Sequence, residues 1–325
     1  MQKTIGQYKD YLLFLMHENY KVFKIQKFNV YTEQRSDVFS WLNGAIEHDV
    51  AYAAWPERNL IALGLDRDNV YVLTKGLESE QSYVVHCKYP DDLEKDNQNI
   101  PIHHLEFAKN HKVLFCSDYG AAILKWSLDY PLDAKLLGLD ATQPVVIEDT
   151  KVLSQGCPKP NPYANYGSRF LVVDQQSRNL YCIHSASQKI ACIDQKDDIH
   201  ADIITSSFSK DLLPDRYHYY KYLTIINGKL FTCISNQGAE KVKVVSFNLD
   251  KKCMELDNKS CKKYELPESI FPNSLSSSPD QKYLMIDSAH DHNISLFYAG
   301  SMKHMQTIQF PSEEANYTEN FYSLP

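Results

Sequence analysis

Glycine is scarce in this chain of 325 residues, with only 11 copies and no Gly-Gly pair. That scarcity argues against kelch-type and other Gly-rich repeats. Long hydrophobic runs are missing as well. No segment approaches the roughly 18 apolar residues of a membrane span, and the run at Tyr11–Met16 is shorter than a signal-peptide core. We therefore expect no membrane insertion and no export signal, and a cytoplasmic (intracellular) location.

Positive charge is in short supply too. Lys and Arg number 34 against 41 Asp and Glu, which gives a net charge of −7. Proteins that neutralise many phosphates need a basic field, so no nucleic-acid partner is expected. One locally basic stretch is interpreted as a solvated hairpin tip, and it contains Lys251, Lys252, Lys259, Lys262 and Lys263.

No CxxC motif occurs among the eight cysteines, and most of them lie inside apolar runs such as Val113–Cys116 and Phe231–Ile234. Disulfide frameworks are denser and belong to shorter secreted chains. Buried free cysteine behaves as a small hydrophobic residue. We interpret these cysteines as reduced core residues of an intracellular protein.

The common catalytic signatures are also absent: there is no GxSxG, GxxxxGK[ST], GxGxxG or HExxH. His290 and His292 flank Asp291 on a predicted hairpin and are interpreted as solvent-facing turn residues, since a metal site needs further ligands. His103 and His104 open a predicted strand and are interpreted as core or loop residues. The sequence thus predicts no catalytic residue, no metal and no cofactor, and hence no enzyme.

What the chain does have is aromatic residues, 22 Tyr and 14 Phe, which favour strands. A four-residue strand pattern, with apolar residues at its first, third and fourth positions, begins at residues 20, 70, 123, 180, 242 and 294. The copy at 123 is weaker, because Lys125 occupies its third position. The successive spacings are 50, 53, 57, 62 and 52 residues. In four repeats a partner strand begins ten residues earlier, at 60, 113, 170 and 284, with turn residues between the two strands.

Such a repeat predicts an all-β chain, a β-propeller of six or seven four-stranded blades that forms one domain over residues 1–325. A single blade cannot cover both of its faces, so blades pack against one another. A seventh blade has room in 139–168 or in 195–228, and the second region contains the hairpin signal Asn227-Gly228. Residues 320–322 are predicted to close the fold by sharing a blade with the N-terminus.

The repeats resemble blades of the WD40-like propeller superfamily. Residues 276–298 give the best copy: Ser278–Leu284 resembles the turn and second strand of such a blade, and Asp291 matches the position of its turn aspartate. A second copy is Ala54–Leu60. The Gly-His and Trp-Asp dipeptides of WD40 blades are absent. Together with the missing catalytic motifs, the resemblance implies a non-catalytic scaffold for protein–protein interaction.

Two aromatic segments are the candidate partner-binding sites. The loop 155–168 is stiffened by prolines at alternate positions, and its tyrosines supply rigid contact area. A tyrosine-rich strand follows at 217–222, in which Tyr220 and Tyr222 are predicted to share a face. We expect a protein partner to bind a ring face or that loop, and the residues expected to contact it are Pro160, Pro162, Tyr163, Tyr166, Tyr217 and Tyr219. The alternative is a propeller enzyme or small-ligand binder, hydrolase or lactonase-like, that uses the central channel. The oligomeric state is left open.

Overall fold

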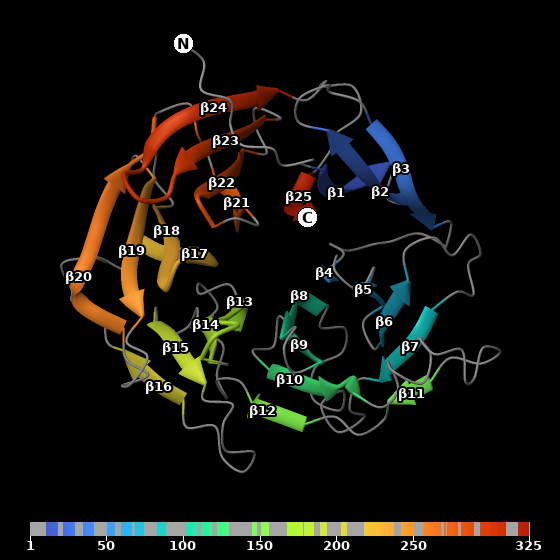
Figure 1. Cartoon of the computed structure of the whole chain (residues 1–325). Coiled ribbons are helices and arrows are strands. Elements are labelled where there is room, and N and C mark those ends of the chain that lie inside the picture. The colour runs from blue at the N-terminus through green and yellow to red at the C-terminus, as the bar shows by residue number, and fades with distance from the viewer. Residues whose placement is uncertain are drawn as a thin grey trace. The chain divides into compact units, whose positions relative to one another are not determined.

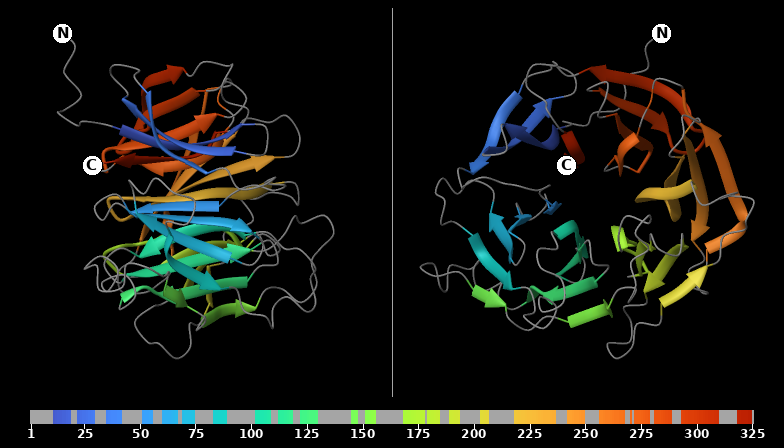
Figure 2. Two further views of the ribbon diagram at one scale, coloured as in Figure 1. Left: turned by 90° about the vertical axis from the view of Figure 1, so that its right-hand side faces the viewer. Right: turned by 180° about the vertical axis from the view of Figure 1, so that it is seen from behind.

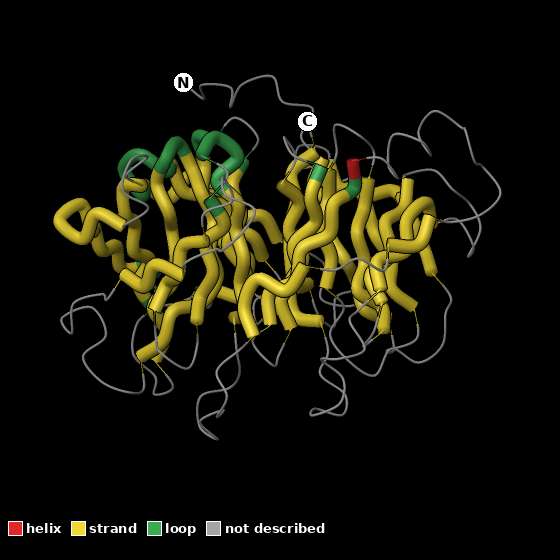
Figure 3. Tube along the Cα trace, turned by 90° about the horizontal axis from the view of Figure 1, so that it is seen from below, coloured by secondary structure: helices red, strands yellow, loops and turns green. Residues whose placement is uncertain are grey.

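The computed structural model describes the strands of the chain and some of the turns between them (Figure 1). The described residues are 11–18, 22–29, 35–41, 51–55, 60–66, 69–74, 83–88, 102–108, 112–118, 122–129, 145–147, 151–155, 168–177, 179–184, 189–193, 203–206, 218–236, 242–249, 256–267, 270, 272–278, 281–288, 293–309 and 318–324. Strands, yellow in Figure 3, make up most of them. They form six sheets within this part of the chain. The number of blades stays a prediction.

The chain divides into two compact units, and each is described by itself. The first contains residues 1–47, 56–58 and 268–325, and the second contains 48–55 and 59–267. Views from two further sides show the small sheets that build them (Figure 2). The single domain over 1–325 stays a prediction. Among the described residues, no helix is long and apolar enough to cross a membrane.

Two four-stranded sheets make up the first unit. One has the order β25-β1-β2-β3, with bounds β1 (Tyr11–Glu18), β2 (Val22–Asn29), β3 (Arg35–Trp41) and β25 (Thr318–Leu324). The other is β21 (Pro272–Ser277), β22 (Tyr283–Ser288), β23 (Asn293–Tyr298) and β24 (Lys303–Gln309). β25 pairs antiparallel with β1, and Leu13 lies opposite Tyr322. The predicted sharing of a sheet by the two ends of the chain is therefore confirmed.

The β21–β24 sheet contains the segment that resembles a WD40 blade most closely. Its predicted turn is closed by Ser278, whose hydroxyl accepts hydrogen bonds from the backbone N–H groups of Lys282 (3.2 Å) and Tyr283 (2.9 Å). The Ser278 carbonyl accepts a third bond from the Gln281 N–H at 2.8 Å. Serine suits this position because its hydroxyl can satisfy the local backbone of a turn.

Four sheets make up the second unit. The first sheet contains β4 (Ala51–Trp55), β5 (Leu60–Asp66), β6 (Asn69–Thr74), β7 (Tyr83–Lys88) and β11 (Val145–Ile147), and the second contains β8 (Ile102–Ala108), β9 (Val113–Asp118), β10 (Ala122–Ser127) and β12 (Lys151–Gln155). The third sheet contains β13 (Ser168–Val173), β14 (Leu180–His184), β15 (Lys189–Ile193) and β16 (Ile203–Ser206). The fourth contains β17 (His218–Ile226), β18 (Lys229–Asn236), β19 (Lys243–Leu249) and β20 (Leu256–Glu265). The first strands of successive sheets contact one another, β4 with β8, β8 with β13, and β13 with β17.

The regions predicted to have room for a seventh blade contribute strands to these four sheets. β11 pairs parallel with β7, and β12 pairs antiparallel with β10. β16 is the last strand of the β13–β16 sheet, and β17 is the first strand of the next. The predicted Asn227-Gly228 hairpin is present between β17 and β18, with both residues in the left-handed region at φ 50° and 70°.

The strand at 170–173 pairs with the strand that begins at 180, as predicted, because β13 and β14 are antiparallel neighbours. Its place in the sheet differs from that of the other partner strands: β13 is the first strand of its sheet, whereas β5, β9 and β22 are second. Leu171 and Val173 belong to one buried cluster and Val172 belongs to another, so β13 is covered on both faces. A doubly covered edge strand has the same continuous apolar sequence as a middle strand, and the pattern does not distinguish the two.

The basic stretch was placed wrongly. Lys259, Lys262 and Lys263 lie within β20, a ten-residue strand at the edge of its sheet, rather than at a hairpin tip. Lys262 and Lys263 are exposed. Lysines on an edge strand disfavour pairing with the strands of other molecules. Lys251 and Lys252 lie outside the described residues.

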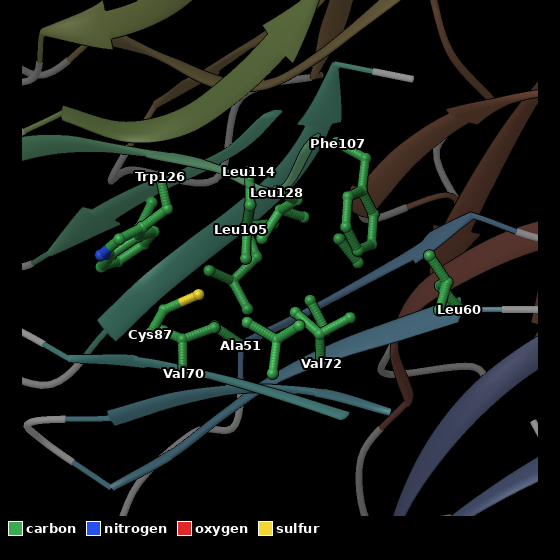
Figure 4. Packing of buried hydrophobic residues seen from close by; sticks show 14 of the residues in the cluster. Ala51, Leu60, Val70, Val72, Cys87, Leu105, Phe107, Leu114, Trp126 and Leu128 are labelled. Atoms are coloured by element: carbon green, nitrogen blue, oxygen red, sulfur yellow. The ribbon is translucent and has the colours of Figure 1, made fainter. Parts of the chain in front are cut away.

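The largest buried cluster lies between the β4–β7 sheet and the β8–β12 sheet (Figure 4). Val70, Val72 and Cys87 from the first sheet pack against Leu105 and Trp126 from the second. The indole Nε1 of Trp126 donates a hydrogen bond to the Lys88 carbonyl at 3.2 Å, so a side chain of one sheet satisfies the backbone of the next. Five of the described cysteines are buried, as expected for core residues: Cys87, Cys116, Cys182, Cys192 and Cys233.

Candidate functional site

Three partly exposed rings lie on consecutive first strands of the second unit. They are His104 of β8, Phe170 of β13 and Tyr222 of β17. The ring centroids of His104 and Phe170 are 6.1 Å apart at 68°, and those of Phe170 and Tyr222 are 4.6 Å apart at 61°. Both contacts have the edge-to-face geometry that aromatic rings favour. We call these three residues the ring row.

Each of the three first strands carries an irregularity at the level of the ring row. The pairing register shifts between Ile102 and His104 in β8, between Ser168 and Leu171 in β13, and between Lys221 and Leu223 in β17. A β-bulge redirects the side chains beside it and is common next to active sites. The ring row is thus placed by local departures from regular pairing.

Tyr222 is the most unusual of the three in its backbone. Its φ is 56°, in the left-handed region that a bulky residue rarely adopts. The bulge at this residue also breaks the alternation that predicted a shared face for Tyr220 and Tyr222. Its neighbours Leu223 and Thr224 are buried, whereas Tyr222 is half-buried against Phe170.

A carboxylate accompanies the ring row on β8. His104 and Glu106 are half-buried, while the alternating Leu105 and Phe107 are buried in the cluster of Figure 4. Residues two apart on a strand share a face, at about 3.3 Å per residue along the chain. Glu106 and His104 therefore lie roughly 7 Å apart along the strand on one face.

Burial keeps the His104 imidazole neutral. Desolvation lowers its pKa from the ordinary 6.5 to about 4, and a hydrogen bond to the Leu171 backbone opposes part of this effect. A bond that raises the pKa is one that the ring N–H donates to a carbonyl, because it favours the protonated form. At neutral pH one ring nitrogen thus donates to Leu171, and the other is left as an acceptor.

Most of the residues predicted to bind a partner lie outside the described residues: Pro160, Pro162, Tyr163, Tyr166 and Tyr217. Tyr219 is in β17, opposite Ser235 of β18. His290 and His292 also lie outside the described part of the chain. These expectations stay predictions. Within the described residues, no three His, Cys, Asp or Glu side chains gather as a metal site would require.

The ring row was not predicted as a site. His104 was expected to be a core or loop residue, and neither Glu106 nor Phe170 was among the candidate site residues. One signal was available, since His104-Leu105-Glu106-Phe107 alternates polar and apolar residues within a predicted strand. Such alternation indicates that one face of β8 is not fully covered.

Comparison with known proteins supports the fold but no family. No family model and no curated protein matches the chain. The β-propeller domain of Cps50 (Swd1) from Myceliophteria thermophila is similar at a TM-score of 0.53 and 12% identity, covering 95% of this chain and 88% of that one. The chain has a β-propeller fold, and its predicted likeness to WD40-like propellers is confirmed at the level of the fold.

Two other similar structures carry the names of enzymes. The periplasmic gluconolactonase PpgL of Pseudomonas aeruginosa has a TM-score of 0.61 and 12% identity, covering 95% of this chain and 82% of that one. A protein from Bacteroides uniformis ATCC 8492, named as a 6-phosphogluconolactonase, has a TM-score of 0.57 and 11% identity, covering 97% and 100%.

These two similarities correct one prediction. The absence of common catalytic motifs led us to expect that the chain is not an enzyme, and that expectation is wrong. The motifs searched for belong to other folds, whereas chains with this fold bear the names of lactone hydrolases. A fold hosts many functions, so catalysis must be argued from the site itself.

Proposed function

We propose that the chain is a lactonase-like hydrolase of small molecules that uses Glu106 and the ring row. The observation that carries the proposal is the half-buried face of β8, which Glu106 shares with His104, together with the ring contacts from His104 to Phe170 and from Phe170 to Tyr222. Ester hydrolysis needs a base for water and a group that orients the substrate, and these residue types supply both. The similarity in fold to proteins named gluconolactonases also supports it.

Glu106 is the proposed general base. Its carboxylate takes a proton from water, and the water oxygen bonds to the lactone carbonyl carbon. The tetrahedral intermediate then collapses, and the bond between that carbon and the ring oxygen breaks. The departing ring oxygen takes the proton back from Glu106, which leaves a hydroxy acid and the original carboxylate.

His104 is proposed to position the substrate rather than to act as the base. The hydrogen bond to the Leu171 backbone occupies one ring nitrogen and leaves the other as an acceptor at a fixed place. This acceptor nitrogen suits a substrate hydroxyl.

The test measures acid release from D-glucono-1,5-lactone in a pH-stat, with the spontaneous hydrolysis in buffer subtracted. We expect the full chain to accelerate hydrolysis, and Glu106→Gln to lower kcat by about 100-fold or more. The matched control is Glu265→Gln, since Glu265 is an exposed carboxylate of β20 opposite Lys243. Hydrolysis no faster than in buffer, or equal rates for the two variants, would refute the proposal.

A protein-binding role is the second candidate. The similarity to the propeller domain of Cps50 (Swd1) supports it, and Tyr163 and Tyr166 of the 155–168 loop are the residues we would test. An affinity capture from native lysate that loses a specific protein when 155–168 is deleted would favour this role. We keep the cytoplasm as the proposed compartment, because the cysteines lie mostly in apolar core strands rather than in the dense framework of a small secreted domain.

A further inference from the structure

We infer that Phe170 and Tyr222 form a platform for the ring of an uncharged sugar lactone, and that the site discriminates against phosphorylated lactones. The inference rests on the proposed function and names the substrate class of the same site. It comes from the burial, the backbone and the charge of the ring row.

Burial separates the two rings from their surroundings. Phe170 is followed by buried Leu171 and Val172, and Tyr222 is followed by buried Leu223. The two rings keep part of their surface exposed although each strand packs its next residues into the core. The rings meet edge to face, at 61°, so each offers its own exposed apolar surface, and an aromatic surface of this kind suits the C–H face of a sugar ring.

The backbone at Tyr222 shows that this placement has an energetic cost. A bulky residue with φ at 56° is strained relative to a regular strand conformation. Regular pairing without the bulge would relieve the strain and return Tyr222 to the alternation of β17. Strained residues that persist in a fold gather at ligand sites, where the strain sets the position of a side chain.

The charge of this face selects the ligand. The two titratable side chains that the structure describes on the face of β8 are Glu106, a carboxylate, and His104, which is neutral because burial disfavours its protonation. A phosphate group near Glu106 would meet a like charge, whereas hydroxyl groups can donate to both side chains. We therefore expect kcat/KM for D-glucono-1,5-lactone to exceed that for its 6-phosphate by about 10-fold or more.

The experiment compares these two substrates in the wild type and in Tyr222→Gly. Glycine accepts a positive φ without strain, so this variant removes the ring while it leaves the backbone relaxed. We expect KM for the uncharged lactone to rise by about 10-fold with little change in kcat, because the ring contributes equally to ground-state and transition-state binding. Tyr222→Phe, which restores a ring, should recover most of the lost affinity.

Two further variants keep the result interpretable. Met302 also has a left-handed backbone, with φ at 55°, in the β23–β24 turn, so Met302→Gly relieves comparable strain away from the ring row. Phe170→Leu removes the other ring with a small change in volume, and it serves if Tyr222→Gly unfolds, as judged by the melting temperature. We expect KM to change in Phe170→Leu and not in Met302→Gly.

The outcomes separate the two proposals. A preference for the 6-phosphate, or an unchanged KM in both Tyr222→Gly and Phe170→Leu, would overturn this inference while leaving lactone hydrolysis in place. No hydrolysis of either substrate by the wild type would overturn the proposed function and the inference with it. A preference for the uncharged lactone that weakens when either ring is removed would support both.

Discussion

The neutral state of His104 makes the stability of the protein depend on pH in a way that one substitution can remove. Burial lowers the pKa of this imidazole from 6.5 to about 4, so between these values the unfolded chain binds a proton that the folded chain does not. Protons then favour the unfolded state, and stability falls as the pH drops through this window. Glutamine in place of His104 has no proton to gain, and its amide can still donate toward the Leu171 carbonyl.

The size of the effect follows from the pKa difference. Each pH unit inside the window costs about 1.4 kcal/mol of folding free energy, which amounts to about 2 kcal/mol at pH 5 and about 3 kcal/mol at pH 4. At pH 7 the contribution falls to about 0.2 kcal/mol, because the imidazole is mostly neutral in the unfolded state as well. His104→Gln is expected to change stability at pH 7 by a fixed amount through altered packing, and then to lose less stability than the wild type on acidification.

Urea denaturation of both proteins at pH 7 and pH 5 tests this. The free energy of unfolding of the variant minus that of the wild type should become about 2 kcal/mol more positive when the pH is lowered from 7 to 5. Carboxylates titrate alike in both proteins and drop out of the comparison. His304→Gln, which replaces an exposed histidine of β24, is the control for histidine replacement in general. A relative stability that is the same at both pH values would refute the buried, neutral assignment of His104.

Two further predictions concern the fold. Gly228→Ala should destabilise the β17–β18 hairpin by about 1 kcal/mol in thermal denaturation, because alanine disfavours the φ of 70° found at this position. The added methyl group would meet no neighbouring atom, so no steric clash adds to this backbone strain. Among the described cysteines, Cys261 should react first with iodoacetamide, because it is half-buried whereas Cys87 is fully buried, and burial raises the thiol pKa of both. Mass spectrometry of the labelled peptides would check the order, and labelling of Cys87 before Cys261 in the folded protein would contradict it.

The sheets could be predicted because their sequence signals are local. The apolar pattern at Ile294–Phe297 and the turn at Ser278 depend on alternation and on one hydroxyl near two N–H groups, both of which are visible in a short segment. The pairing of β25 with β1 was also predictable, because a repeat that lacks one strand at its start needs a strand from the other end. The place of β13 as the first strand of its sheet was not predictable, because burial on two faces removes the alternation that would have marked it as an edge strand.

The candidate site depends on features that leave no such signal. Nothing in the sequence around Tyr222 marks a left-handed residue, since tyrosine is a poor choice for that conformation and glycine or asparagine would be expected. The imidazole of His104 is neutral because burial lowers its pKa, and its hydrogen-bond partner is the backbone of Leu171, which is 67 residues further along the chain and in another sheet. A motif search tests residues that are close in sequence, whereas these contacts exist only once the sheets have packed.

This difference explains why motif absence misled the functional prediction while the repeat did not mislead the fold prediction. In a fold built from repeated sheets, residues of neighbouring first strands are separated by whole repeats: His104, Phe170 and Tyr222 are 66 and 52 residues apart. A site assembled in this way has one or two residues from each repeat and no fixed spacing, because the loops between strands vary in length. On such a fold, a half-buried polar residue or a bulge on a first strand is therefore a better indicator of a site than any contiguous motif.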